Sequence, residues 1–599
     1  MRTQTMTSPT EITAPVCSFR RLRASLAALV TVVLTACGGG GEITVDPPVS
    51  AVAVSNPRAL PAEYLARQAV AYGPYRTAAS ASDLANEVIP PSNIKQDMDL
   101  LVAGNFRLIR LFDSSDKVAK QTLDVIVDNG LDIKMQLGAF MGGFKFVANP
   151  LKVEQIKAAN LRELDRAIAL ANNAKYRDVI LTVSVGNENI VDFSAERLDP
   201  ADLAVYIKYV RDRVRQPVTT DDNFQVFSNP IPKALLDQID FVAIHAYPVI
   251  DTEFPNSPLY WDWKQLSVPA GPARAAAMMD ASIVELKKQF QATRDALNSV
   301  GLSKMPVVIT ETGWKARITG NQAFRAHPVN QKMYFQRLET WRRESRLSGT
   351  GPVNIFYFEA FDEPWKLGDD GWGLFNKDRK ARYVVQNLYP QSNWENASLT
   401  DADAVYFVPP VIGAPFPGNA FTLYSDAPGA SLVAGYNLDA FDGFTAPRNL
   451  ADTTIAAAPG DGAVSMRITP APAGFGWGLL YNPQTGGTTQ NLAAFNSVGA
   501  WINTTYPGKI EIGLSTLDVD GNAQEAFVQI GNGEYGYCNT GSWCRVSIPL
   551  QAFQAVNPKL DFRLVLNPFY IADRYSFTGK ASGSNIRIPL NVDGIGWSR

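Results

Sequence analysis

Two glutamates stand at the ends of apolar runs that are typical of β-strands. Glu188 is the last residue of the run Val179–Glu188, and Glu311 is the last residue of the run Met305–Glu311. If both runs are strands of one parallel barrel, their carboxyl groups meet at its mouth. Two carboxyl groups across such a cleft are what retaining hydrolysis of a glycosidic bond requires, because one protonates the leaving oxygen while the other attacks the anomeric carbon.

The two carboxyl groups need different protonation states. We predict that Glu188 is the acid/base, whose pKa must be raised so that it holds a proton near neutral pH. We predict that Glu311 is the nucleophile, which must be ionised and needs a hydrogen-bond donor beside it. Asn187 suits a hydrogen bond to the sugar 2-hydroxyl, and retention requires the two carboxyl groups to lie about 5–5.5 Å apart. The alternative is that both glutamates make only structural hydrogen bonds at strand ends.

The elements that would position these residues form a repeating pattern. Between about residues 61 and 395, strand-like apolar runs alternate with segments of helical period, which predicts a parallel sheet with crossover helices. Leu203, Ile207 and Val210 lie at helical spacing, and Asp199-Pro200 marks a helix start. Eight strands are expected, as in a (β/α)8 TIM barrel: Ala69–Arg76, Phe106–Phe112, Asp132–Phe140, Val179–Glu188, Pro217–Thr220, Ile239–Tyr247, Met305–Glu311 and Val353–Phe361.

Six short segments along this region resemble the motifs of glycoside hydrolase family 17, a member of clan A. In order they are Ala71–Arg76, Ile109–Asp113, Ala243–Pro248, Ile309–Trp314, Phe361–Lys366 and Trp372–Phe375, and Asn187-Glu188 resembles the acid/base motif of the clan. The resemblance implies action on β-1,3-glucan with retention, either as an endo-glucanase or as a glucan-remodelling transferase.

Several further residues are candidates for substrate binding. Tyr72 lies in the opening motif, and Trp314 lies beside Glu311 as either a sugar platform or a core residue. Tyr247 ends the sixth strand, so its hydroxyl either reaches Glu311 or packs in the core. Glu363 and Lys366 either pair with each other or bind sugar hydroxyls, and the resemblance favours the second role.

The composition excludes some classes of function. The chain has 599 residues, a net charge of −3 and only two histidines, His245 and His327. The net charge argues against a nucleic-acid-binding protein, which needs a basic surface. Two histidines are too few for a histidine-rich metal site. We expect no cofactor, and we interpret His245 as a structural histidine.

The last third of the chain has a different character. After a linker at residues 396–419, residues 420–599 show short alternating strands and turn signals, which predict a jelly-roll β-sandwich. Trp543–Leu550 and Val592–Ile595 resemble stretches of the carbohydrate-binding modules that accompany bacterial laminarinases. A sugar-binding module needs exposed aromatic rings, and Trp477, Trp501 and Tyr535 are the candidates. The alternative is a structural accessory domain.

Two local features of this last third can be interpreted. Cys538 and Cys544 flank a five-residue stretch that a disulfide could close. Asp518–Asn522 is either a structural calcium loop or a hairpin turn, and the turn is favoured because the downstream glutamate of a calcium loop is missing.

The N-terminus carries a targeting pattern. Residues 1–36 contain arginines followed by a short apolar run, and Leu34–Cys37 resembles the bacterial lipobox. We expect lipidation of Cys37, a flexible tether over residues 37–60, and anchoring in the outer membrane of a Gram-negative cell envelope. The alternative is an ordinary cleaved signal peptide.

Taken together, these features favour a monomeric endo-β-1,3-glucanase whose partner is β-1,3-glucan. A β-1,3-glucanosyltransferase uses the same covalent intermediate and differs only in whether water or a sugar hydroxyl resolves it. A glucan-binding lipoprotein without catalysis is the third hypothesis, and the presence of both carboxylates argues against it.

Overall fold

The computed structural model describes residues 57–228, 230–250, 258–317, 325–366, 371–440, 447–471, 476–484, 489–581 and 584–599. The chain divides into two compact units between Phe407 and Val408. The predicted signal segment and Cys37 lie outside the described residues, so lipidation remains a prediction. Among the helices in the described ranges, none is both long enough and apolar enough to cross a membrane.

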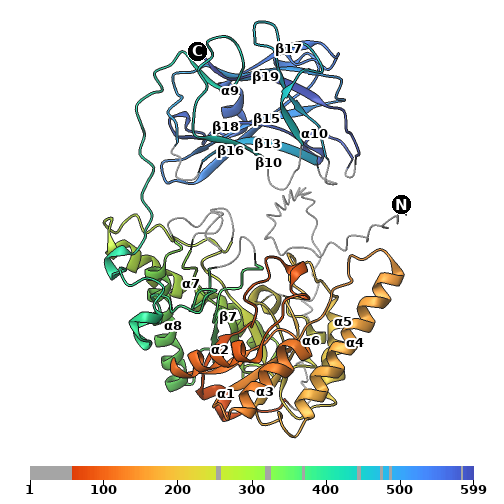
Figure 1. The fold of residues 1–599 in the computed structure, drawn as a ribbon, viewed down its shortest axis with the longest axis vertical. Coiled ribbons are helices and arrows are strands. Elements are labelled where there is room, and N and C mark those ends of the chain that lie inside the picture. The colour runs from red at the N-terminus through yellow and green to blue at the C-terminus, as the bar shows by residue number, and fades with distance from the viewer. Residues whose placement is uncertain are drawn as a thin grey trace, which may run out of the picture. The chain divides into compact units, whose positions relative to one another are not determined.

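The first unit is a closed barrel of eight parallel strands in the order β1 to β8 (Figure 1). The predicted (β/α)8 barrel is therefore confirmed. Its strands are β1 Gln68–Ala71, β2 Phe106–Arg110, β3 Lys134–Ala139, β4 Ile180–Asn187, β5 Val218–Asn223, β6 Val242–His245, β7 Val307–Thr312 and β8 Ile355–Tyr357.

Most strand boundaries differ from the predicted ones by a few residues, but β5 differs in an informative way. The prediction ended this strand at Thr220, before the acidic residues Asp221 and Asp222. The strand continues through both residues, and each is almost completely buried. Buried carboxylates inside a barrel need partners, and these partners lie in the candidate site described below.

Helices surround the barrel and begin in a consistent way. Proline is the first residue of α2, α4, α5, α7 and α8, where its missing N–H costs no hydrogen bond. Asp199 precedes α5 as expected, although its carboxylate pairs with Lys145 instead of capping the helix. The helices are α1 Ala62–Ala66, α2 Pro91–Ala103, α3 Gln121–Asp128, α4 Pro150–Asn172, α5 Pro200–Arg211, α6 Lys233–Leu236, α7 Pro272–Ser299 and α8 Pro328–Ser348.

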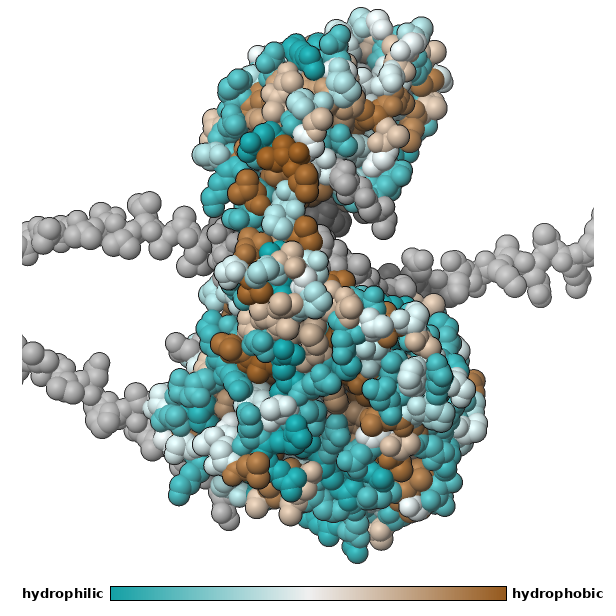
Figure 2. Space-filling model, turned by 90° about the vertical axis from the view of Figure 1, so that its left-hand side faces the viewer, coloured by the Kyte–Doolittle hydropathy of each residue, from teal (hydrophilic) through white to brown (hydrophobic). Residues whose placement is uncertain are grey.

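The barrel interior changes from apolar to charged along its axis. An apolar cluster contains Leu108 of β2, Phe356 of β8 and Phe241, which directly precedes β6, and Tyr64 from α1 packs into it. The Tyr64 hydroxyl donates to Gln136, which in turn donates to Asp221. Apolar packing therefore supports a polar layer nearer the mouth. The face drawn in Figure 2 is largely hydrophilic over this unit, with hydrophobic side chains scattered among polar ones.

The second unit consists of two antiparallel sheets around one apolar core, as predicted. One sheet has the order β10-β13-β18-β15-β16. The other has the order β11-β12-β19-β14-β17, and β9 pairs with β19. The strands are β9 Ala420–Tyr424, β10 Tyr436–Ala440, β11 Arg448–Asp452, β12 Ser465–Ile468, β13 Gly476–Pro483, β14 Ser497–Thr504, β15 Ile510–Leu517, β16 Ala523–Ile530, β17 Trp543–Pro549, β18 Val565–Arg574 and β19 Leu590–Ser598; the short helices are α9 Leu550–Val556 and α10 Tyr575–Thr578.

The prediction of three sugar-binding aromatic residues in this unit is wrong for one of them. Trp477 is completely buried, and its indole N–H donates to the Tyr506 hydroxyl, so it belongs to the core. Trp501 is half-buried with the Arg545 guanidinium 6.0 Å from its ring. Tyr535 is 41% exposed. The prediction overlooked that an inward strand position buries tryptophan like any other large apolar residue.

Two local predictions in the second unit can be compared with the structure. Cys538 and Cys544 form a disulfide, with Cα atoms 5.8 Å apart. Asp518–Asn522 is the turn between β15 and β16, where the Asp518 carboxylate accepts the backbone N–H groups of Asp520 and Asn522. The hairpin interpretation therefore describes this segment. Within the described ranges, the acidic residues close enough to share an ion are instead Asp426, Asp461 and Asp593.

Candidate active site

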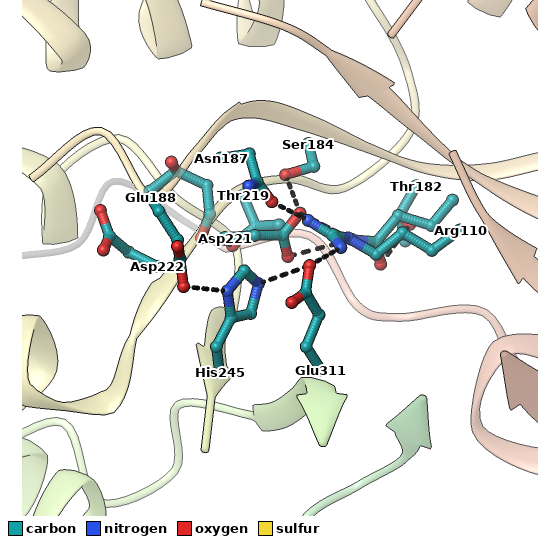
Figure 3. Close-up of polar contacts among 12 residues, drawn as sticks. Arg110, Thr182, Ser184, Asn187, Glu188, Thr219, Asp221, Asp222, His245 and Glu311 are labelled. Atoms are coloured by element: carbon teal, nitrogen blue, oxygen red, sulfur yellow. Dashed lines mark hydrogen bonds and ion pairs between the residues drawn. The ribbon is translucent and has the colours of Figure 1, made fainter. Parts of the chain in front are cut away.

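A layer of polar side chains fills the barrel mouth, where the strands end (Figure 3). It is built from β2, β4, β5, β6 and β7, each of which contributes one or more charged or hydrogen-bonding groups. Glu188 and Glu311 both belong to this layer, on opposite sides of the imidazole ring of His245. The structure therefore brings together the two carboxyl groups that the sequence singled out.

Glu188 has an unusual backbone conformation directly after β4. Its φ angle is +51°, in the left-handed region that residues with a side chain rarely adopt. Gly186 has φ +85°, and a Cβ at that position would lie 2.3 Å from the Asn189 amide oxygen. The Glu188 N–H donates to the Asp221 carbonyl at 2.9 Å. These surrounding contacts hold a strained residue in place, and such strain is commonest at functional sites.

Arg110 is the central cation of the site. Its guanidinium is 1% exposed and donates to Glu311 at 2.5 Å, to Asp221 at 3.0 Å and to the Asn187 amide oxygen at 2.5 Å. Ser184 also donates to Asp221, at 2.5 Å. One arginine on β2 thus fixes side chains on β4, β5 and β7. Its fork-shaped donor group suits several acceptors at once.

Glu311 is held as a carboxylate. Burial by itself would raise its pKa, but the positive charges of His245 and Arg110 and a hydrogen bond from Tyr247 together lower it. The Tyr247 hydroxyl donates to Oε2 of Glu311 at 2.7 Å, which is the contact expected from the position of Tyr247 at the end of the sixth strand.

His245 lies between the two carboxyl groups. The ring is completely buried, with Nδ1 2.9 Å from Oε1 of Glu188 and Nε2 3.5 Å from Oε1 of Glu311. Burial lowers the pKa of His245, but the two carboxylates raise it by more. His245 therefore links the two carboxyl groups through one ring, and its interpretation as a structural histidine stays a prediction.

Asp222 is a second buried acid close to Glu188. Burial and the negative charge of Glu188 raise the pKa of Asp222 to about 7. Its carboxyl group accepts the backbone N–H groups of Ile190 and Asn223, each at 2.8 Å. The contact with Ile190 ties the segment after Glu188 to β5.

A separate charged cluster lies after β8. The Lys366 ammonium is 2.6 Å from both Glu359 and Glu363, and all three residues are largely buried. Burial and the charge of Glu363 raise the pKa of Glu359, although Lys366 opposes them. The two carboxylates in turn raise the pKa of Lys366 despite its burial. Glu363 also approaches Gly73 so closely that a Cβ there would lie 2.1 Å from it.

Two predicted substrate-binding residues lie in the core instead. Tyr72 is completely buried, and its hydroxyl donates to Asp97 at 3.1 Å. Trp314 is completely buried, donates to the Arg325 carbonyl at 2.7 Å and packs against Tyr334. Neither ring can contact a sugar, because both side chains point from the strand ends toward the surrounding helices.

The sequence reasoning did not identify Arg110, Asp221, Asp222 or Glu359 as site residues. Arg110 and Asp221 could have been found from the sequence, because a charged residue within an otherwise apolar buried strand must be paired. Recognising the pairing requires the barrel closure, since Arg110 and Glu311 are 201 positions apart.

The arrangement provides two distinct chemical capacities. Glu311 is stabilised as an anion in a site that is nearly closed to solvent, with a side chain 9% exposed. Glu188 is 25% exposed, with Nδ1 of His245 2.9 Å from its carboxyl group. An ionised carboxylate can attack a carbon centre as a nucleophile, while a second carboxyl group opposite it transfers a proton to the leaving group.

Comparison with known families identifies the barrel. The model of the BtgE/BtgC glycoside hydrolase domain matches residues 69–374, which contain all eight strands except the first residue of β1.

Individual relatives are distant. The probable glucan endo-1,3-beta-glucosidase btgC of Aspergillus clavatus is 22% identical over 320 residues, which are 49% of this chain and 39% of the relative. The chain thus spans about two fifths of the length of that curated relative.

Two solved structures match part of this chain. The endo-laminarinase from Formosa Hel1_33_131 matches with a TM-score of 0.47 at 23% identity, over 57% of this chain and 90% of that one. The glycoside hydrolase family 17 β-1,3-glucanosyltransferase from Rhizomucor miehei matches with a TM-score of 0.36 at 21% identity, over 53% and 96%.

Proposed function

Since the chain belongs to the BtgE/BtgC glycoside hydrolase family, we propose that it is a retaining endo-β-1,3-glucanase. The observation that carries the proposal is the placement of Glu188 and Glu311 on opposite sides of His245 at the barrel mouth. The Aspergillus relative is described as a glucan endo-1,3-beta-glucosidase, which supports the choice of substrate.

The proposed first step is attack by Glu311 on the anomeric carbon. Arg110 and Tyr247 hold its carboxylate ionised and fix both of its oxygens, which limits the movement needed to reach the sugar. Glu188 gives its proton to the glycosidic oxygen as the bond breaks, and the product is a covalent glycosyl-enzyme.

In the second step, Glu188 acts as a base instead of an acid. Its carboxylate takes a proton from a water molecule, and the water oxygen attacks the anomeric carbon and releases Glu311. Two inversions give net retention. The mechanism requires the two carboxyl groups to lie about 5–5.5 Å apart.

Product analysis on laminarin oligosaccharides tests the proposal. Hydrolysis gives only shorter products, and proton NMR of the first products should show the β-anomer. Glu311→Gln should be inactive on every substrate. Glu188→Gln should retain activity on aryl β-laminaribiosides with good leaving groups, because these do not need protonation. Release of the α-anomer, or full activity of Glu311→Gln, would overturn the assignment.

The same experiment separates hydrolysis from transfer. Products longer than the starting oligosaccharide would mean that a sugar hydroxyl competes with water for the intermediate. Laminarin binding without any cleavage would instead support the non-catalytic glucan-binding hypothesis.

We propose that the second unit binds glucan and raises its local concentration at the barrel. The segment up to Phe407 belongs with the barrel, because Arg274 donates to the buried Phe407 carbonyl at 2.8 Å. Truncation after Phe407 should therefore leave cleavage of laminarihexaose nearly unchanged and weaken cleavage of insoluble glucan. Equal losses on both substrates would show that the second unit stabilises the barrel instead.

We also propose that Cys37 is lipidated and anchors the protein at the cell envelope. The lipobox-like order Leu34–Cys37 supports this proposal. Metabolic labelling with a palmitate analogue should mark the wild-type chain and not Cys37→Ser.

A further inference from the structure

Three phenylalanines are exposed on two neighbouring loops of the barrel mouth. Phe140 is 46% exposed, Phe146 is 71% exposed and Phe193 is 48% exposed. Phe140 and Phe146 follow β3, and Phe193 follows β4. Single exposed apolar residues are ordinary on a soluble protein, but three partly exposed large rings on adjacent loops are candidates for ring–sugar contacts.

The two loops are joined by several direct contacts. The Gly143 N–H donates to the Glu196 carboxylate at 2.7 Å, and the Lys145 N–H donates to the Arg197 carbonyl at 3.0 Å. A Cβ on Gly143 would lie 2.1 Å from the Glu196 backbone, so the loops approach as closely as glycine allows. The Arg197 guanidinium lies 5.4 Å from the Phe146 ring centroid. Phe140, Phe146 and Phe193, here called the phenylalanine surface, are therefore carried on one connected unit.

This unit is also tied to the segment that carries Glu188. The side-chain amide of Asn189 donates to the Met141 carbonyl at 2.9 Å and to the Glu196 carbonyl at 2.5 Å. Its amide oxygen accepts the Asn187 N–H at 3.0 Å. Phe193 follows Glu188 by only five residues. The phenylalanine surface consequently lies on the Glu188 side of the cleft.

The side of the cleft decides which part of the substrate is held there. In the proposed mechanism Glu188 protonates the oxygen of the leaving sugar, so that sugar lies toward Glu188. On the side of β8 the cleft carries the buried ions Glu359, Glu363 and Lys366 instead. The partly exposed phenylalanine rings are thus on the loops after β3 and β4, which are tied to the segment that carries Glu188.

We propose that the phenylalanine surface binds the glucose units on the leaving-group side of the cleaved bond, and with them the incoming sugar in any transfer reaction. The apolar C–H face of a pyranose packs on a phenyl ring, while its hydroxyls remain in water. The inference rests on the proposed function, and it assigns the recognition of the leaving sugar to Phe140, Phe146 and Phe193.

The test compares two substrates in the full chain and in Phe140→Ala, Phe146→Ala and Phe193→Ala. Laminarihexaose has sugars on the leaving side, whereas an aryl β-laminaribioside has only a phenol there. Each loss of a ring should lower kcat/KM for laminarihexaose by about three- to tenfold, mainly through KM, if it removes one ring–sugar contact. The aryl substrate should react at the wild-type rate.

A matched control is available on the second unit. Phe577 is 50% exposed, and Phe577→Ala should leave both substrates unchanged. Thermal melting checks that each variant is folded. With laminaritriose added as acceptor, the share of transfer products should fall in Phe193→Ala relative to the control.

Several outcomes would overturn the inference. Unchanged laminarihexaose kinetics in all three variants would mean that the surface binds no sugar. Equal losses on both substrates would mean that the loops only support Glu188, and a changed oligomeric state with unchanged kinetics would make the surface a protein interface. If the wild type cleaves neither substrate, the proposed function fails as well, which separates the two failures.

Discussion

Removing the hydroxyl of Tyr247 should shift the acid side of the pH–activity profile. The hydroxyl donates to Glu311 at 2.7 Å, and the ring packs against Trp372 and Phe358 with centroid distances of 5.2 and 5.9 Å. Tyr247→Phe keeps these ring contacts and deletes the hydrogen bond to Glu311. The variant should therefore fold like the wild type.

The size of the shift follows from the hydrogen bond. A hydrogen bond to a charged group contributes about 1.5–3 kcal/mol, and one pKa unit corresponds to about 1.4 kcal/mol. Because Arg110 and His245 still stabilise the Glu311 carboxylate, we expect a loss at the low end of this energy range. The pKa of Glu311 should then rise by about one unit. The nucleophile must be ionised, so activity is present above this pKa and is lost as the pH falls. The acid limb should consequently move to higher pH by about one unit.

The assay is kcat/KM on an aryl β-laminaribioside over a range of pH, since this ratio reports groups of the free enzyme. Tyr334→Phe is the matched control, because the Tyr334 hydroxyl contacts Thr312 at 2.6 Å and not Glu311. The control should keep the wild-type acid limb. If Tyr247→Phe also keeps it, while Glu311→Gln is inactive, Tyr247 does not stabilise the ionised nucleophile.

Three further predictions concern stability. Because the pKa of Asp222 is raised to about 7, the wild type should lose stability as the pH rises from about 4 to 7, and urea unfolding of Asp222→Asn should lack this loss. Arg110→Met removes the cation that pairs with Asp221 and one of the partners of Glu311 and should lower the free energy of unfolding by about 3–5 kcal/mol; a loss under about 1 kcal/mol would contradict the central role of the arginine. Replacing Cys538 and Cys544 by serine should cost about 2 kcal/mol in the second unit, measured by its own melting transition, with unchanged cleavage of laminarihexaose.

The elements of the barrel were predictable because local patterns encode them. Apolar runs followed by helical segments define eight crossover units, and Glu188 and Glu311 stood out because each ends such a run. The same reasoning could not choose between a sugar platform and the core for Trp314, since a residue after a strand can point either inward or outward. It was wrong at Trp477, which takes an inward position within β13.

The electrostatic partners in the site were not predictable from local patterns. Arg110 contacts Asp221, 111 positions away, and Glu311, 201 positions away. Burying the consecutive residues Asp221 and Asp222 of β5 is unfavourable in isolation. It becomes favourable only when the Arg110 cation and the backbone N–H donors after β4 are in place. His245 likewise has its role only when the strands on both sides carry carboxylates.

The shared contacts of Arg110 also determine how the strands can be aligned. A slip of one strand by a single residue turns its side chains to the opposite face of a sheet. Such a slip of β2, β5 or β7 would leave a guanidinium or a carboxylate in an apolar interior without its partner, at a cost of several kcal/mol. Misaligned barrels are thereby disfavoured more strongly than hydrophobic packing alone would achieve. The groups that the proposed reaction uses thus also specify the one alignment in which the chain can close its barrel.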